Sequence, residues 1–78
     1  MNTRVKFVNL EGSVLALFPD EIYNRELFGK TQIMSYMHNG QHGPALYGLM
    51  RRKSLPKEKY LPLKKELESI GYALEVLK

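Results

Sequence analysis

One stretch decides the fold of this chain: Val5-Lys6-Phe7-Val8-Asn9-Leu10-Glu11-Gly12-Ser13-Val14-Leu15-Ala16-Leu17-Phe18. Its first four residues place valine and phenylalanine on one face and a lysine on the other, which is the period of a half-buried strand. Its last five residues are apolar on both faces, as in an inner strand that is covered on each side. The polar residues between them include a glycine and suit a hairpin loop. Pro19 is expected to end the second strand, because proline has no amide to donate to a ladder. The first twenty residues therefore predict a β-hairpin.

The last third of the chain contains the clearest helix signal. Apolar residues recur there at three- and four-residue steps and form one stripe that we expect to be core: Tyr60, Leu63, Leu67 and Ile70. Gly71 lies just past the stripe, where a left-handed helix cap is expected. Pro62 would break a helix that began at Pro56, so we expect a turn, a kink, and a regular helix from about Leu61.

The middle of the chain is less regular. Residues 31–37 alternate and predict a third strand, with Ser35 on one face and Tyr36 on the other. The pair Asn39-Gly40 favours a tight turn, residues 44–50 favour a short helix, and residues 20–30 favour a loop. Residues 72–77 alternate again and predict a final strand.

These elements predict a single domain over residues 1–78 with a two-layer α+β fold. We expect a small four-stranded, mainly antiparallel sheet in the order β-β-β-α-β, with one amphipathic C-terminal helix packed on one face. The exposed edges of such a small sheet also suggest a homodimer.

Composition narrows the functional classes. The chain has 78 residues, of which 44% are hydrophobic and 26% charged, and it contains no cysteine. A disulfide framework and a thiolate zinc site are therefore excluded. The N-terminus lacks the apolar core of a signal peptide, and no apolar run reaches the ~20 residues that cross a bilayer. We expect a cytoplasmic protein that does not engage a membrane.

The densest run of hydrogen-bonding side chains is Ser35-Tyr36-Met37-His38-Asn39-Gly40-Gln41-His42-Gly43, which holds both histidines of the chain. Aromatic anchors among adaptable polar groups suit contact with a partner. We expect a non-enzymatic module that binds an unidentified protein through Tyr36, His38, Asn39, Gln41 and His42. The alternative is a structured turn whose polar side chains satisfy the backbone of the loop.

Catalytic and metal-binding functions have weaker support. His38 and His42 have the spacing of a helical zinc motif, but Gly40 argues against a helix and no third ligand is evident. Ser35 lacks the glycines of a nucleophile elbow. We therefore expect no metal, no cofactor and no catalytic residue. A small metal-dependent enzyme, or one that uses the histidines as acid and base, stays open as an alternative.

A second candidate surface is basic. The net charge is +4, and cations cluster after residue 50, with Tyr47 and Tyr60 nearby: Arg51, Arg52, Lys53, Lys57 and Lys59. Such a cluster suits phosphate contact and base stacking, so nucleic-acid binding is the alternative function. Glu58 lies within the cluster, and a charge of this size is also ordinary for solubility.

Three segments carry a resemblance: Ala16-Leu17-Phe18-Pro19, Ser35-Tyr36-Met37-His38-Asn39-Gly40-Gln41-His42, and Glu66-Leu67-Glu68-Ser69-Ile70-Gly71-Tyr72. With them the chain resembles a group of small uncharacterised bacterial proteins associated with phages and mobile elements. The resemblance covers nearly the whole chain and implies a cytoplasmic bacterial or phage setting. It implies no activity and assigns no role to any residue.

Overall fold

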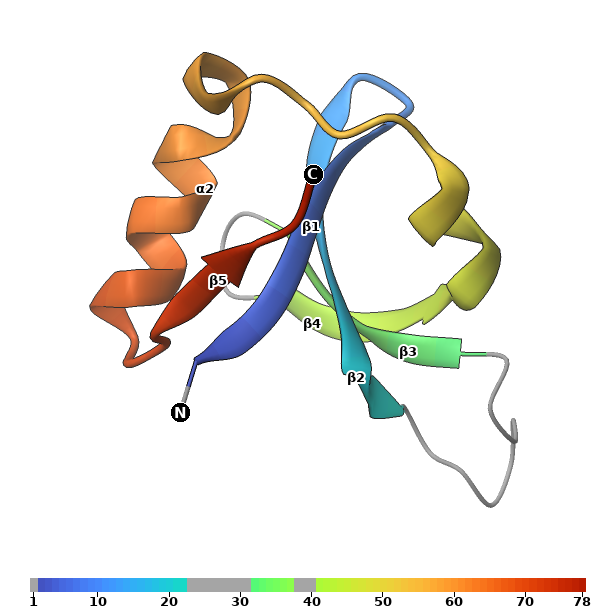
Figure 1. Cartoon of the computed structure of the whole chain (residues 1–78), viewed down its shortest axis with the longest axis horizontal. Helices are drawn as coiled ribbons and strands as arrows, with labels where there is room; N and C mark the ends of the chain where they lie inside the picture. The colour runs from blue at the N-terminus through green and yellow to red at the C-terminus, as the bar shows by residue number, and fades with distance from the viewer. Residues whose placement is uncertain (1, 23–31, 38–40) are drawn as a thin grey trace.

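The computed structural model describes residues 2–22, 32–37 and 41–78 (Figure 1). Over these residues the order of elements is β1 (Thr3–Leu10), β2 (Ser13–Ile22), β3 (Gln32–Met37), β4 (Gln41–Leu46), the 3-10 helix η1 (Tyr47–Arg51), α2 (Lys57–Ser69) and β5 (Leu74–Val76). The predicted α+β class is confirmed. The loop predicted for residues 20–30 and the turn at Asn39-Gly40 lie mainly or wholly outside the described residues.

The strands form one five-stranded sheet in the order β4-β3-β2-β1-β5. Strands β1 to β4 pair antiparallel with their neighbours, whereas β5 runs parallel to β1. The sheet is therefore mixed and has one strand more than the predicted four. The additional strand is β4, which occupies part of the segment 44–50 predicted as a short helix. Pro44 is tolerated there because β4 is an edge strand of the described sheet, where a missing amide breaks no central ladder.

The predicted hairpin is confirmed, with longer strands and a tighter turn. Only Glu11 and Gly12 separate β1 from β2, and their φ angles of 51° and 86° are both positive, as a type I′ turn requires. The amide of Gly12 donates to Asn9 Oδ1 at 3.1 Å. The prediction that Pro19 ends the second strand is wrong. Strand β2 continues to Ile22, because the ladder with β3 shifts register after Phe18 and so needs no amide from the proline.

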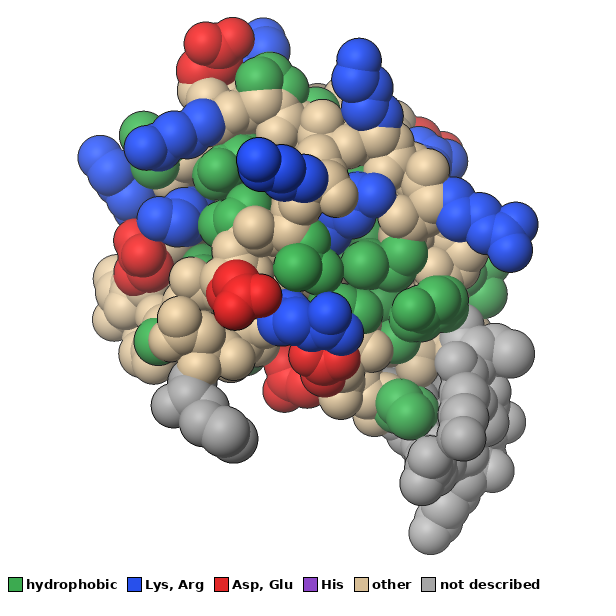
Figure 2. Space-filling view, in the orientation of Figure 1, with side chains coloured by type: hydrophobic (Ala, Val, Ile, Leu, Met, Phe, Trp, Pro, Cys, Tyr) green, Lys and Arg blue, Asp and Glu red, His purple; other side chains and the backbone are tan. Residues whose placement is uncertain are grey.

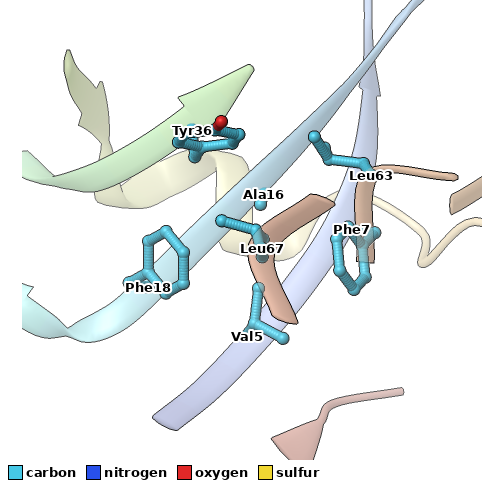
Figure 3. Close-up of a cluster of buried hydrophobic side chains, with 7 residues drawn as sticks. All are labelled: Val5, Phe7, Ala16, Phe18, Tyr36, Leu63 and Leu67. Atoms are coloured by element: carbon cyan, nitrogen blue, oxygen red, sulfur yellow. The ribbon is translucent and has the colours of Figure 1, made fainter. Parts of the chain in front are cut away.

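The two faces of the sheet carry separate apolar clusters. On one face, side chains of β1, β2 and β3 pack against α2 (Figure 3): Val5, Phe7, Ala16, Phe18 and Tyr36 against Leu63 and Leu67. On the other face, Val8, Leu15, Leu17 and Ile33 pack against residues of η1 that include Leu49 and Met50. Figure 1 shows α2 and η1 on opposite sides of the sheet.

This second cover overturns the prediction that β1 is only half-buried. Lys6 and Val8, on the supposed solvent face, are both buried. The aliphatic stem of Lys6 lies beneath the cover, and its Nζ donates to the carbonyl oxygen of Met50 at 2.6 Å. The ammonium group of Lys6 can be accommodated beside the buried cluster because the carbonyl of Met50 accepts its hydrogen bond.

Helix α2 begins at Lys57, earlier than predicted, and runs through Pro62. Because the proline is the sixth residue, it removes one backbone hydrogen bond, to the carbonyl of Glu58, and the helix continues past it. The predicted stripe holds at Leu63 and Leu67, which are fully buried, and partly at Tyr60, which stacks on Phe7. It fails at Ile70, which is 54% exposed.

Gly71 ends α2 as predicted. Its φ is 113°, its amide donates to Glu68 O at 3.2 Å, and the amide of Tyr72 donates to Leu67 O at 3.1 Å. This pair of bonds is the Schellman motif, which returns the chain to the sheet as β5. Strand β5 covers only Leu74–Val76, within the predicted 72–77.

We predict that Gly71→Ala lowers the free energy of unfolding by about 1–2 kcal/mol, because a side chain at positive φ is strained even in open space. Gly48→Ala is the matched control, since Gly48 lies in η1 with open space around its Cα and no positive φ. We expect the control to stay within about 0.5 kcal/mol of the wild type. Urea unfolding with an unchanged m value measures both variants. Equal effects at the two glycines would contradict the role of the Schellman motif.

Candidate functional site

Ser35 and Tyr36, at the start of the predicted loop, are parts of the core. They lie on opposite faces of β3, as their alternation predicted. Ser35 is buried, and its Oγ donates to the carbonyl oxygen of Gly43 on β4 at 2.9 Å. The Tyr36 side chain is 2% exposed, and its hydroxyl donates to the carboxylate of Glu66 on α2. Both residues therefore position the segment and do not present themselves to a partner.

Among the described side chains of the predicted site, that of His42 faces solvent. It lies directly opposite Tyr36 in the β3–β4 register, and its ring meets the Tyr36 ring edge-on at 4.6 Å. Its Nε2 lies 3.2 Å from the hydroxyl of Tyr72, within hydrogen-bonding distance. The Tyr72 ring in turn stacks on Phe18 at 5.3 Å. An exposed imidazole is thus held by two tyrosines that are themselves anchored in the core.

The rest of the predicted set cannot be placed. His38 and Asn39 lie outside the described residues, and so does the side chain of Gln41. Of the five predicted contact residues, the structure therefore brings together Tyr36 and His42. Within the described part of the chain, no three His, Cys, Asp or Glu side chains gather in a way that could hold a metal ion.

Tyr72 and Glu66 belong to this site and were missed by the sequence reasoning. Each lies thirty residues beyond its partner, and only the return of α2 and β5 to the sheet brings them together. Burial raises the pKa of the Tyr72 hydroxyl above its usual value, and the nearby Glu21 carboxylate raises it further. At neutral pH this hydroxyl is protonated and can donate to or accept from the imidazole of His42.

The predicted basic cluster begins with Arg51, the last residue of η1, and continues along the connection from η1 to α2 and into the first turn of α2. All five of its cations are exposed: Arg51, Arg52, Lys53, Lys57 and Lys59. The connection crosses the end of the β1–β2 hairpin, where the amide of Leu55 donates to Phe7 O and Arg52 donates to Asn9 O, each at 2.9 Å. Figure 2 shows Lys and Arg side chains spaced over the upper part of this face, where Figure 1 places the connection.

The aromatic part of that prediction is corrected. The ring of Tyr60 lies parallel to that of Phe7, with centroids 4.5 Å apart and planes 7° apart. Its face toward the sheet is therefore occupied, and the ring is part of the packing rather than a free platform for a base. Tyr47 is half-exposed but lies at the opposite end of η1 from the connection.

The described residues enclose no pocket, so the candidate surfaces are open ones. Among the same residues, no helix is long and apolar enough to cross a membrane. No protein-family model matches the chain, and neither a curated protein nor a solved structure is significantly similar to it. The resemblance to small bacterial and phage proteins therefore stays a prediction.

The raised pKa of Tyr72 predicts how stability depends on alkaline pH. Below pH ~10 the tyrosine is protonated in both the folded and the unfolded chain, so pH has no effect through it. Above that value the unfolded tyrosine ionises first, and the free energy of unfolding falls until the folded pKa is passed. Tyr72→Phe lacks this proton, so we expect the wild type to lose stability relative to the variant as pH rises through ~10. A difference that stayed constant in urea unfolding from neutral to alkaline pH would contradict the burial of this hydroxyl.

Proposed function

We propose that this chain is a small non-enzymatic binding module that engages a protein partner through His42 and the exposed face of β4. The observation that carries the proposal is the way His42 is held. Its ring is exposed to solvent, yet Tyr36 and Tyr72 contact it from the core side. A side chain that is ordered before binding has less conformational freedom to lose when a partner arrives.

The neighbours of His42 support contact with a protein. Pro44 and Leu46 are exposed at alternate positions of β4, so they share the face of His42. Leu46 is 60% exposed, so it adds apolar surface to the strip that Pro44 and His42 form on this strand. A strip with one aromatic hydrogen-bonding group and two apolar groups matches the mixed composition of protein interfaces.

The shape of β4 favours recognition by side chains over the addition of a further strand. Pro44 lies in the middle of this six-residue edge strand and offers no amide to a new neighbour. An incoming strand would therefore find an interrupted ladder. The predicted homodimer through a sheet edge remains a proposal. A dimer formed through β4 would lack the backbone hydrogen-bond donor at Pro44.

A cytoplasmic setting is part of the same proposal. The chain has no cysteine, so its stability does not depend on disulfide bonds that a reducing compartment would break. The bacterial or phage setting implied by the resemblance leads us to search for the partner in a bacterial lysate.

The proposal predicts that His42→Ala weakens capture of a specific partner about tenfold or more, as truncation of a central contact residue does. Immobilised wild type, His42→Ala and the control Glu75→Ala are compared by quantitative mass spectrometry of proteins retained from the lysate. Glu75 is a matched control because it is exposed on β5, at the opposite edge of the sheet. A partner retained by the wild type and the control, but lost with His42→Ala, supports the proposal. If all three proteins retain the same set in equal amounts, His42 is not the contact residue.

A further inference from the structure

The net positive charge of this chain equals the net charge of one short segment. Residues 51–59 contain five cations and one acid, Glu58, which equals the net charge of +4 of the whole chain. The remaining seven cations and seven acids balance one another. The excess charge is therefore a local property of the η1–α2 connection and not a charge spread evenly for solubility.

The cations of this segment have few charged partners. All five are exposed, and none of them forms an ion pair with another described residue. Arg52 donates a hydrogen bond from its guanidinium to Asn9 O. Elsewhere on the described surface, Arg4 pairs with Asp20 and Lys64 with Glu68. Lys65 and Lys78 are also exposed without an ion pair to a described residue, but each of them is single, whereas residues 51–59 gather five such cations in one segment that is open to an external anion.

The fold gains little from charges placed here. Lys57 and Lys59 lie in the first turn of α2, where the helix dipole disfavours cations, and only Glu58 there has the favoured sign. The last turn of α2, which would favour cations, contains no basic residue. Since this arrangement does not stabilise the helix, it calls for a reason outside the fold.

We propose that residues 51–59 form a contact surface for the phosphate backbone of double-stranded nucleic acid, with Arg51, Lys53, Lys57 and Lys59 as the phosphate-binding side chains. Exposed cations at the end of η1, on the connection and in the first turn of α2 can neutralise several phosphates, which follow one another on each strand at about 3.4 Å of duplex axis. Such contacts position a protein on nucleic acid without reading its sequence.

The neighbourhood of the segment favours a duplex over two other polyanions. A surface that binds single strands presents free aromatic faces for base stacking, but residues 51–59 contain no aromatic residue and the nearby Tyr60 ring has one face stacked on Phe7. A membrane-binding surface combines cations with exposed apolar side chains. The exposed large apolar residues of the described chain are Ile22, Leu46, Tyr47 and Ile70. All four lie outside residues 51–59. The segment offers charge alone, which is what a regular phosphate backbone requires.

The test measures affinity for a short DNA duplex of random sequence by fluorescence anisotropy over a range of salt. For the wild type we expect log K to fall with log salt with a slope of about −3 to −4, at about 0.9 per phosphate contacted. Arg51→Gln with Lys53→Gln should make the slope less negative by about 2 and weaken binding at low salt about tenfold. The pair Lys64→Gln with Lys65→Gln removes the same charge from the far part of α2 and should change the slope by less than about 0.5.

Four outcomes would overturn the proposal. The first is equal loss of affinity in the two double variants, which would reduce the effect to net charge. The second is a wild type whose affinity does not depend on salt. The third is tighter binding to a single strand of the same length, and the fourth is tighter binding to phosphatidylserine vesicles than to the duplex. His42→Ala should bind the duplex as the wild type does, so this test can fail or succeed independently of the proposed protein partner.

Discussion

The structure depends on covering both faces of the β1–β2 hairpin at once. A 78-residue chain has little apolar material, and this one divides it into two clusters on opposite sides of the same two strands. Helix α2 covers one side, and the short helix η1 covers the other. A hydrogen bond from Lys6 Nζ to the carbonyl oxygen of Met50 joins β1 to this second cover. Without α2, four buried apolar side chains of the hairpin would face water, and without η1 three would do so.

This constraint determines what remains for function. The segment Ser35 to Gly43 contains the densest hydrogen-bonding run of the sequence, but its first two residues serve the core and the bridge between β3 and β4. His42 is what this segment offers to a partner among its described side chains. The η1–α2 connection is the second exposed feature, and it exists because the chain has to pass from one cover to the other across the end of the hairpin. The two proposed surfaces thus have different chemistry and lie on different parts of the molecule.

The parts of the fold that the sequence predicts well are those decided by neighbours in the chain. The hairpin, the stripe at Leu63 and Leu67, and the helix end at Gly71 follow from local alternation, periodicity and one glycine. The missed features depend on tertiary pairing. A strand at β4 requires an edge on which Pro44 is harmless, and the extension of β2 past Pro19 requires a register shift with β3. No local pattern carries that information.

The same distinction applies to the candidate site. The alternation of β3 correctly placed Ser35 and Tyr36 on opposite faces, and the exposed cations after residue 50 could be read from charge alone. The contacts that hold His42 and Tyr36 could not be predicted, because Tyr72 and Glu66 come from the other end of the chain. Their positions depend on how α2 and β5 return to the sheet, which periodicity does not specify.

Native-state hydrogen exchange by NMR tests most directly the central claim that Tyr36 and Ser35 belong to the core while the η1–α2 connection lies open. We predict that amides of Tyr36 and of the buried hairpin residues exchange with free energies close to that of global unfolding. Amides of the connection, such as that of Lys53, should exchange far more readily. If the amide of Tyr36 instead exchanged as fast as that of Lys53, Tyr36 would belong to a mobile binding loop and the account of the core would be wrong.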